Sequence, residues 1–448
     1  MKFISNSNDV SKFLGTSVKK NIPIKSISID TRTLRKNALF IAIKGNSFNG
    51  NNYVNTAIKK GASLVIADGK EFKDSKDKRI IYVPDSIKAL KKISKNIISS
   101  FEGEIVGITG SNGKTSTTSM INQCLKGSSS TMKNFNNEIG MPLSIMNAKR
   151  ASTCLVMEMG AANFGDIHYL SSFLKPHVGV ITNIGSSHLE NLKNINGVFK
   201  VKSEMVSNIK KNGCLVIPSE NKNHQSQWKE MRNDISIITF GLSKDSDFYA
   251  ADINYSINKT SFTILSTKHN VKQRINSNLA GEHNIKNILA TFSVLFFLNK
   301  SEKDIVKSIK NIKLMGRQDQ FSWINKSTLI DDTYNANPDS VKKSIDLLSN
   351  SQKRKVLVLG DMLELGRMRK HMHKKIGNYA SHKKIDILLG FGDLTKYAVD
   401  AFGKNGVFFS NENELKIFLK QNISSNDVVL LKGSRGMQME KFINAISN

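Results

Sequence analysis

Short apolar runs alternate with amphipathic stretches along the first part of the chain, and their spacing predicts a small α/β unit. Residues 26–29, 38–43 and 63–67 have the composition of strands. Residues 53–60 have helical spacing and precede Gly61, a common helix terminator. A lysine-rich helical segment then connects this unit to the next one.

The pattern changes to regular alternation of strands and helices near residue 104. Helical stretches separate three apolar runs, at residues 105–109, 153–157 and 178–182. Such alternation is typical of a mostly parallel sheet with helices on both faces. Further on, β-runs such as 235–240 and 261–265 predict an antiparallel edge, and a helix is expected at 284–298.

A third block begins near residue 313 and again alternates strands with helices. Its strand-like runs are residues 329–330, 355–359, 385–389, 407–409 and 428–431. This pattern predicts a second doubly wound unit, of the Rossmann type. The predicted fold is therefore α/β with three domains: a small N-terminal α/β domain (1–83), a central P-loop ATPase-type domain with a mostly parallel sheet (84–314) and a C-terminal Rossmann-like domain (315–448).

The net charge of +29 raises the question of a nucleic-acid partner. Lysines and arginines are, however, spread along the whole chain. The densest basic run comprises Arg367, Arg369, Lys370, Lys374 and Lys375, with His371 and His373 between them. Aromatic residues of the kind that stack bases are not interleaved there, so we predict a solvated helix face and no nucleic-acid partner.

The sequence also bears on location. It contains no apolar run of the ~20 residues that a membrane span requires, and its N-terminus lacks a signal-like segment. The three cysteines, Cys124, Cys154 and Cys214, are odd in number and far apart, which argues against a disulfide framework or a metal knuckle. We therefore expect a cytoplasmic protein without a membrane span, acting as a monomer.

A glycine-containing segment between a predicted strand and a predicted helix carries the clearest chemical signal. We predict that it binds the phosphates of ATP through Gly110, Ser111, Asn112, Gly113, Lys114, Thr115 and Ser116. Lys114 would contact the β- and γ-phosphates, and the Thr115 hydroxyl would contact Mg²⁺. The strict P-loop pattern has a glycine where Ile108 stands, and an ordinary glycine-rich turn is the alternative. The Gly113-Lys114-Thr115 sequence after a buried-looking strand favours the phosphate loop.

Polar side chains follow two neighbouring strands of the predicted central sheet. Glu158 follows the run at 153–157, and His188 follows the run at 178–182 after a loop. Doubly wound sheets bind ligands at the carboxyl ends of their strands, where a carboxylate and an imidazole can share a metal ion. A single histidine is more often structural, so the spacing alone leaves both roles open for His188.

Further motifs extend over all three blocks. They are residues 30–32 (DTR), 134–142 (NFNNEIGMP), 201–204 (VKSE), 281–287 (GEHNIKN), 316–317 (GR), 331–340 (DDTYNANPDS), 360–366 (GDMLELG) and 431–437 (LKGSRGM). Together they resemble the motifs of the Mur ligases, ATP-dependent enzymes that add amino acids to UDP-N-acetylmuramic acid in cell-wall synthesis. Within this family they are most similar to the branch that adds D-alanyl-D-alanine to UDP-N-acetylmuramoyl-tripeptide.

The resemblance implies an ATP site with two Mg²⁺ ions. Catalysis is expected from Lys114, Lys202, His188 and Arg317, with Lys202 matching the lysine that relatives carry as a carbamate. Glu158, His188 and the carbamate would bind the second ion, beside the one at Thr115. Asn287 would contact the adenine and Asp332 the ribose. Asn284 would lie near the phosphates, and Arg317 would reach ATP when the domains close.

The resemblance also implies where the other two substrates bind. Asp30, Thr31 and Arg32 would hold the uridine end, and Asn137 would face the sugar-peptide. The incoming dipeptide would meet Tyr334, Asn335 and Asn337, with Lys432 or Arg435 offsetting its carboxylate. The sequence departs from the family pattern at Asn49 and Asn51, which replace an acid and a histidine.

The expected reaction proceeds through an acyl phosphate formed from ATP and the terminal carboxylate of the tripeptide. Another amide ligase of this superfamily, one that adds a different amino acid or acts on a folate tail, is the alternative within the enzyme class. The element at 30–32 and the loop at 337–340 argue against both, and the arginine that holds a single incoming amino acid in relatives is absent from this loop. A nucleic-acid-binding ATPase would need a clustered basic face, and a non-catalytic homologue would lack the intact set of Lys114, Glu158, His188, Lys202 and Asp332.

Overall fold

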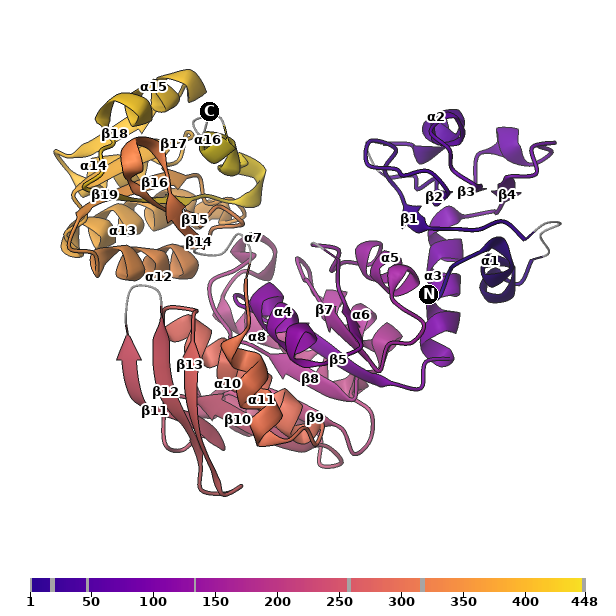
Figure 1. Ribbon diagram of the computed structural model, residues 1–448, viewed down its shortest axis with the longest axis horizontal. Helices are drawn as coiled ribbons and strands as arrows, with labels where there is room; N and C mark the ends of the chain where they lie inside the picture. Colours follow the sequence, from indigo (N-terminus) through magenta and orange to yellow (C-terminus); the bar gives the residue numbers. More distant parts are fainter. Residues whose placement is uncertain are drawn as a thin grey trace.

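The structure is a computed structural model that describes residues 2–16, 21–45, 48–132, 134–255, 259–314 and 319–444. Three β-sheets follow one another along the chain, each with its own helices (Figure 1). We call the three parts the N-terminal, central and C-terminal units. In Figure 1 the N-terminal unit lies at the upper right, the central unit below it and the C-terminal unit at the upper left. The predicted α/β class, with its three sheets, is confirmed.

The N-terminal unit is built on a parallel four-stranded sheet. Its strands, in spatial order, are β1 (Ser26–Ser28), β2 (Ala38–Ile41), β3 (Leu64–Ala67) and β4 (Ile80–Tyr82). Its helical elements are α1 (Ser7–Leu14), η1 (Gly50–Tyr53), α2 (Val54–Lys59) and η2 (Lys70–Phe72). Helix α3 (Ser86–Ser99) leads from β4 to the central unit, where it packs on α5 (Gly140–Asn147).

The central unit contains a nine-stranded sheet in the order β13-β12-β11-β10-β9-β8-β5-β7-β6. The strands are β5 (Glu104–Thr109), β6 (Ser128–Ser130), β7 (Cys154–Glu158), β8 (Val178–Ile181), β9 (Cys214–Pro218), β10 (Ser236–Gly241), β11 (Phe248–Tyr255), β12 (Thr260–Ser266) and β13 (Val271–Ser277). The pairs β11–β12 and β12–β13 are antiparallel and the others are parallel, as predicted.

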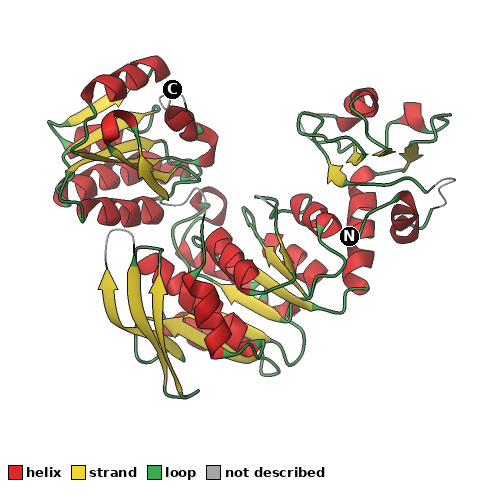
Figure 2. Ribbon diagram, viewed as in Figure 1, coloured by secondary structure: helices red, strands yellow, loops and turns green. Residues whose placement is uncertain are grey.

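Helices cover both faces of the parallel part of this sheet (Figure 2). Besides α5 they are α4 (Lys114–Cys124), α6 (Asp166–Leu174), α7 (Leu189–Leu192), α8 (Ile195–Ser203), η3 (Val206–Asn208), α9 (Lys222–Met231), α10 (Glu282–Phe297) and α11 (Glu302–Lys310). Successive strand residues point to opposite faces, so Ile105 joins the core under α5 and α6, while Val106 and Ile108 join the core under α4 and α10. Burial on both faces explains the continuous apolar runs.

The C-terminal unit contains a six-stranded sheet in the order β14-β15-β19-β16-β17-β18. The strands are β14 (Asp319–Ser322), β15 (Thr328–Asp332), β16 (Arg354–Gly360), β17 (Ile387–Phe391), β18 (Gly406–Phe409) and β19 (Asp427–Lys432), and only β14 pairs antiparallel. The helical elements are η4 (Ile324–Lys326), α12 (Pro338–Ser349), η5 (Gly366–Met368), α13 (Arg369–His382), α14 (Lys396–Phe402), α15 (Glu412–Asn422), η6 (Arg435–Met437) and α16 (Glu440–Asn444).

Some elements differ from the predicted ones. Strand β17 begins at Ile387 rather than at Ile385, because the backbone N–H of Ile385 bonds back to Ala380 at the end of α13. Strand β6 consists of three serines and therefore lacks an apolar signal. In the basic run at 367–375 the arginines and lysines are exposed as predicted.

His373 contradicts the prediction of a solvated helix face, because it is fully buried. Its Nε2 accepts a hydrogen bond from the Met362 N–H (3.0 Å), and its Nδ1 lies 2.7 Å from the Arg369 carbonyl oxygen. Burial lowers the pKa of this imidazole. His373 therefore fixes the loop after β16 onto α13, as a structural residue. None of the helices in the described part of the chain is long and apolar enough to cross a bilayer.

Candidate active site

The predicted phosphate loop connects the end of β5 to the start of α4, as its sequence indicates. Gly110 and Gly113 both have positive φ angles, of 146° and 80°. A Cβ at Gly110 would collide with the Thr182 side chain, and one at Gly113 would lie 2.5 Å from Asn287 Oδ1. The loop therefore needs glycine at both positions, since it packs tightly between β8 and α10.

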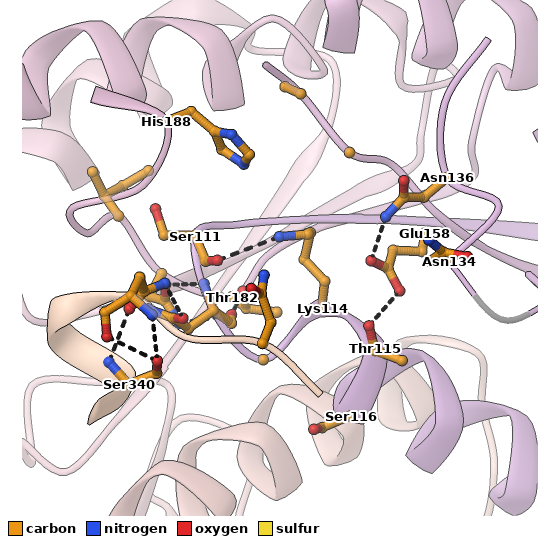
Figure 3. Close-up of a pocket in the computed structure, with 18 of the residues that line it drawn as sticks. Ser111, Lys114, Thr115, Ser116, Asn134, Asn136, Glu158, Thr182, His188 and Ser340 are labelled. Carbon is orange, nitrogen blue, oxygen red and sulfur yellow. Dashed lines mark hydrogen bonds between the residues drawn. The ribbon is translucent and has the colours of Figure 1, made fainter. Parts of the chain in front are cut away.

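The Lys114 side chain folds back over this loop (Figure 3). Its Nζ donates hydrogen bonds to the carbonyl oxygens of Gly110 (2.7 Å) and Ser111 (3.3 Å). The helix begins at Lys114 itself, so the N–H groups of its first turn add to those of the loop. Loop amides, a helix N-terminus and a lysine thus converge on one place, which is the chemistry of a phosphate site.

The Glu158 carboxylate, at the end of β7, connects the phosphate loop with the 134–142 motif. Its Oε2 accepts a hydrogen bond from the Thr115 hydroxyl, and its Oε1 accepts one from Asn136 Nδ2, both 2.8 Å long (Figure 3). Glu158 is 2% exposed, yet it lies at the cleft that contains the loop. Asn137, which we singled out in the 134–142 motif, instead accepts from the Gly140 N–H at the start of α5. The neighbouring Asn136 contacts Glu158. Sequence reasoning did not single out Asn136, and the only hint of its role was the run of asparagines in the 134–142 motif.

His188 lies in the cleft but has a different partner from Glu158. Its Nδ1 is 2.8 Å from Oε2 of Glu364, which belongs to the C-terminal unit. The hydrogen bond from His188 is the main cause of the lowered pKa of Glu364. Within the described residues, no three histidine, cysteine, aspartate or glutamate side chains are grouped as a metal site.

Lys202 is buried on α8 beneath the cleft rather than in its lining. Its Nζ is fully buried and has no hydrogen-bond partner in the part of the chain that the structure describes. Burial, together with the positive charge of Lys114, lowers the pKa of Lys202 to about 7. At neutral pH about half of an amine with this pKa is uncharged, and the uncharged form is nucleophilic.

Asp332 and Lys432 are predicted to meet different ligands, but they form an ion pair with each other. Lys432 Nζ lies 2.6 Å from Asp332 Oδ2 and donates a second hydrogen bond to the Asn335 carbonyl oxygen (3.0 Å). Ser344 donates to the same Asp332 oxygen (2.6 Å). Arg435 is more exposed and pairs with Glu440 at 2.8 Å.

Two hydrogen bonds join the C-terminal unit to the central unit, one at the phosphate loop and one at the loop after β8. Asn337 Nδ2 donates a hydrogen bond of 2.7 Å to Oδ1 of Asn112, in the loop itself. Asp339 Oδ2 accepts one of 2.9 Å from the backbone N–H of Ser186. Asn337 was a candidate from sequence, whereas Asp339 was noted only as part of the loop at 337–340, which lacks the arginine of other relatives.

One cleft of about 1650 Å³ brings most of the candidate residues together. Those that line it are Ser111, Asn112, Gly113, Lys114, Thr115, Ser116, Asn137, Glu158, His188, Asn284, Asn287, Asp332, Tyr334, Asn335, Asn337, Lys432 and Arg435. Gly110 and Lys202 lie behind its surface, and Arg317 lies outside the described residues. A phosphate-binding loop on a mostly parallel sheet, facing a Rossmann-like unit across one cleft, defines a multidomain enzyme that uses a nucleoside triphosphate.

Comparison with known proteins identifies the family. Three family models match consecutive segments: "Mur ligase family, catalytic domain" at residues 23–103, "Mur ligase middle domain" at 108–295 and "Mur ligase, glutamate ligase domain" at 316–435. The UDP-N-acetylmuramoyl-tripeptide–D-alanyl-D-alanine ligase of Bacillus subtilis (strain 168) is 31% identical over 431 residues, which cover 94% of this chain and 92% of the relative. The chain belongs to the Mur ligase family.

Further relatives and solved structures agree with this assignment. The same-named ligase of Buchnera aphidicola subsp. Baizongia pistaciae is 32% identical and covers 99% of this chain and 96% of its own. Among solved structures, MurF from Acinetobacter baumannii has a TM-score of 0.86 at 26% identity, covering 98% of this chain and 97% of its own. MurF ligase from Thermotoga maritima in complex with ADP has a TM-score of 0.81 at 26% identity, with coverages of 94% and 97%.

The residues predicted for the uridine end lie outside this cleft, after β1. The Arg32 guanidinium makes hydrogen bonds to both carboxylate oxygens of Asp30 (Nε to Oδ1 3.0 Å, Nη2 to Oδ2 2.8 Å), and its side chain is largely exposed. The Thr31 carbonyl oxygen accepts from Lys60 Nζ (2.8 Å). Asn51, which replaces a family histidine, is buried and bonds to Asp68 (2.6 Å), so it holds the end of β3 in place.

Proposed function

We propose that this enzyme joins D-alanyl-D-alanine to UDP-N-acetylmuramoyl-tripeptide at the expense of ATP, giving the UDP-linked pentapeptide, ADP and phosphate. The observation that carries the proposal is the shared cleft. It contains the phosphate loop with Lys114 and, on the facing unit, the cationic residues Lys432 and Arg435. The names of the full-length relatives support the same two substrates.

ATP is proposed to bind across the central and C-terminal units. The loop residues Gly110 to Ser116 would hold the phosphates, with Lys114 turning from the loop carbonyls to the β- and γ-phosphates. Asn287 on α10 and Asp332 on β15 line the same cleft, which supports their assignment to the adenosine end, and Asn284 on α10 lines it as well and would lie near the phosphates. The resemblance to the Mur ligases adds Arg317 to the residues that are proposed to bind ATP. The ADP complex of the Thermotoga maritima relative supports nucleotide binding in this fold.

The residues present fit a magnesium ion at the loop. Thr115 and Glu158 supply a hydroxyl and a carboxylate whose oxygens are 2.8 Å apart, and such oxygen donors together with substrate phosphates form typical Mg²⁺ sites. Bound Mg²⁺ neutralises negative charge on the phosphates during phosphoryl transfer. By resemblance, Glu158, His188 and carbamylated Lys202 would hold the second ion.

Carbamylation of Lys202 is supported by the environment of its amine. The reaction with CO₂ requires an uncharged amine: the nitrogen lone pair forms a bond to carbon, one proton is released, and the product is an anion. Burial lowers the Lys202 pKa to about 7, so the uncharged amine is available at neutral pH. The Lys202 Nζ has no hydrogen-bond partner among the residues that the structure describes, and the carbamate would add a negative charge and two acceptor oxygens there. Carbon-13 NMR of the protein in labelled bicarbonate tests this, with Lys202→Gln as the control.

Catalysis then depends on positioning the substrates and neutralising their negative charges rather than on a nucleophile from the protein. A carboxylate oxygen of the tripeptide attacks the γ-phosphorus, and the bond to ADP breaks, which gives the acyl phosphate. The uncharged dipeptide amine next attacks the carbonyl carbon, the bond to phosphate breaks, and the nitrogen releases a proton as the amide forms. Tyr334, Asn335 and Asn337 would orient the dipeptide, and Lys432 or Arg435 would offset its carboxylate. Asn137 would face the sugar-peptide.

Each of the three units is proposed to bind a different substrate or part of a substrate. Asp30, Thr31 and Arg32 would hold the uridine in the domain at 1–83, ATP would bind mainly to 84–314, and the dipeptide to 315–448. Closure of the units around the substrates would exclude water from the acyl phosphate. Dependence on ATP supports a cytoplasmic location.

Phosphate release by the purified protein tests the proposal. We expect release only when ATP, Mg²⁺, UDP-N-acetylmuramoyl-tripeptide and D-alanyl-D-alanine are all present, with a pentapeptide product detected by mass. Lys114→Met should abolish the release, whereas Lys126→Met, an exposed lysine beyond α4, should not. Release with single amino acids in place of the dipeptide would instead identify another Mur-type ligase.

A further inference from the structure

We propose that Lys91 binds an anionic group of the UDP-linked substrate, at a point between its uridine and the carboxylate that is activated. The inference rests on the proposed function and adds a specificity-determining residue to it. The group is a phosphate of the diphosphate or a carboxylate of the peptide.

Lys91 occupies the end of the cleft that is remote from the C-terminal unit. It lies on α3, the helix that leads from the N-terminal sheet to the central unit, and it lines the same cleft as Lys114. Asp166 and Tyr169 of helix α6 in the central unit line the cleft as well, and Tyr169 contacts Lys91. A ligand that fills the cleft therefore meets Lys91 where the N-terminal unit joins the central one.

The sheet topology places the uridine element and the start of α3 on one edge. All strands of the N-terminal sheet are parallel, so Asp30, which follows β1, and Ser86, which follows β4, lie at the carboxyl edge of the sheet. Three strand spacings separate them, about 14 Å. Lys91 lies five residues into α3, about 8 Å along the helix from that edge. A substrate anchored at Asp30 and reaching Lys114 has Lys91 beside its path.

The Lys91 ammonium is held in place by an aromatic ring rather than by an acid. Its Nζ lies 4.8 Å from the ring centroid of Tyr169, and the two side chains belong to different elements, α3 and α6. Such a contact orients a cation without neutralising it. The charge therefore stays available for an anion in the cleft.

Other cations of the cleft have carboxylate partners. Lys286 pairs with Glu220 (2.9 Å) and Glu282 (2.8 Å), and Lys432 pairs with Asp332 (2.6 Å). Among the lysines and arginines that line the cleft in the described ranges and lie outside the phosphate loop, Lys91 and Lys343 make no ion pair with a carboxylate. Lys343 belongs to α12 of the C-terminal unit, so Lys91 is the one of the two that lies next to the N-terminal unit.

Lys92 provides a matched control on the same helix. It is the next residue, it is exposed and it does not line the cleft. For Lys91→Met we expect the dissociation constant and KM of UDP-N-acetylmuramoyl-tripeptide to rise about tenfold or more, as expected for loss of a charge-assisted hydrogen bond. The KM values of ATP and D-alanyl-D-alanine should stay within about twofold, and Lys91→Arg should restore most of the affinity. Lys92→Met should behave as the wild type.

Calorimetric titration separates the outcomes. If Lys91→Met binds the UDP-tripeptide as tightly as the wild type does, the inference is wrong. It is also wrong if Lys92→Met weakens binding equally. A wild type that binds no UDP-tripeptide would refute the proposed function instead. Titration with UDP-N-acetylglucosamine, which has the diphosphate but no carboxylate, identifies the group: weakening by Lys91→Met there indicates the diphosphate, and weakening with the tripeptide substrate alone indicates a peptide carboxylate.

Discussion

Asp339 accepts a hydrogen bond of 2.9 Å from the backbone N–H of Ser186, and this bond joins the C-terminal unit to the central one. A Cβ at Gly185, the residue before Ser186, would lie 2.7 Å from the same Asp339 oxygen, so a side chain there would displace this carboxylate. Gly185 also exchanges two hydrogen bonds of 2.9 Å with the Ser111 hydroxyl. The first turn of α12 is thereby connected to the phosphate loop.

Removal of the Asp339 carboxylate should therefore impair catalysis more than folding. We expect Asp339→Ala to lower kcat about tenfold, because a hydrogen bond to a charged group that aligns the two units is lost. Asp339→Asn keeps an acceptor oxygen and should retain most of the activity. Steady-state kinetics and thermal unfolding measure the two effects, with Asp400→Ala, at an exposed position on α14, as the control. Equal losses for Ala and Asn would contradict the role of the hydrogen bond.

The Asp332–Lys432 pair should be important for the stability of the C-terminal unit. Lys432→Met leaves a nearly buried carboxylate without its cation, which typically costs about 3–5 kcal/mol. The double variant Asp332→Asn/Lys432→Met removes both charges and should recover much of that loss. Unfolding in urea, analysed as a double-mutant cycle, measures the coupling between the two residues. Additive losses would show that the pair does not act as a unit.

Glu158→Gln should weaken the proposed magnesium site and leave the fold intact. A glutamine amide still accepts a hydrogen bond from Thr115, but it lacks the negative charge that favours Mg²⁺. We expect a large fall in activity at low Mg²⁺, about a hundredfold, with partial recovery when the Mg²⁺ concentration is raised. Glu138→Gln, at an exposed position lining the same cleft, serves as the control. An unchanged Mg²⁺ dependence in Glu158→Gln would exclude this carboxylate as a ligand.

Lys202 should make the stability of the protein depend on pH in a defined window. Its folded pKa of about 7 is below the ordinary value of 10.5 that it has in the unfolded chain. Between these values the unfolded state binds one more proton, so this residue makes the folded state more stable as pH rises from 7 to 10.5. Below pH 7 both states are protonated, and the destabilising effect of the buried charge is complete.

The comparison with Lys202→Met isolates this contribution. In CO₂-free buffer, the stability advantage of Lys202→Met should be largest at and below pH 7 and should shrink toward pH 10.5. The free energy of unfolding of both proteins, measured across this range, tests the prediction. An advantage independent of pH would mean that Lys202 has an ordinary pKa in the folded protein.

Local sequence patterns account for most of the fold. The apolar run at 105–109 and the glycines after it predicted β5, the phosphate loop and α4, because these features depend on residues close together in the chain. The antiparallel edge formed by β11 to β13 was also predicted from β-runs. Three serines at β6 carry no apolar signal, and this strand forms because the neighbouring β7 provides backbone partners.

Contacts between distant segments could not be predicted in this way. Asp332 and Lys432 are one hundred residues apart, and their pairing follows from the parallel register of β15 and β19, in which they are direct neighbours. The sequence did not predict this pairing, because each residue was matched to a motif separately. Asp339 was missed for a similar reason, since its partner Ser186 belongs to another unit.

The fate of the oxygen atoms in the tripeptide carboxylate tests the central claim most directly. UDP-N-acetylmuramoyl-tripeptide labelled with heavy oxygen at its terminal carboxylate is incubated with the enzyme, ATP, Mg²⁺ and D-alanyl-D-alanine. Activation of this carboxylate at the phosphate loop predicts that one labelled oxygen appears in each phosphate released, with a labelled oxygen retained in the new amide. Phosphate that carries no label, released together with an unchanged tripeptide, would contradict the assignment.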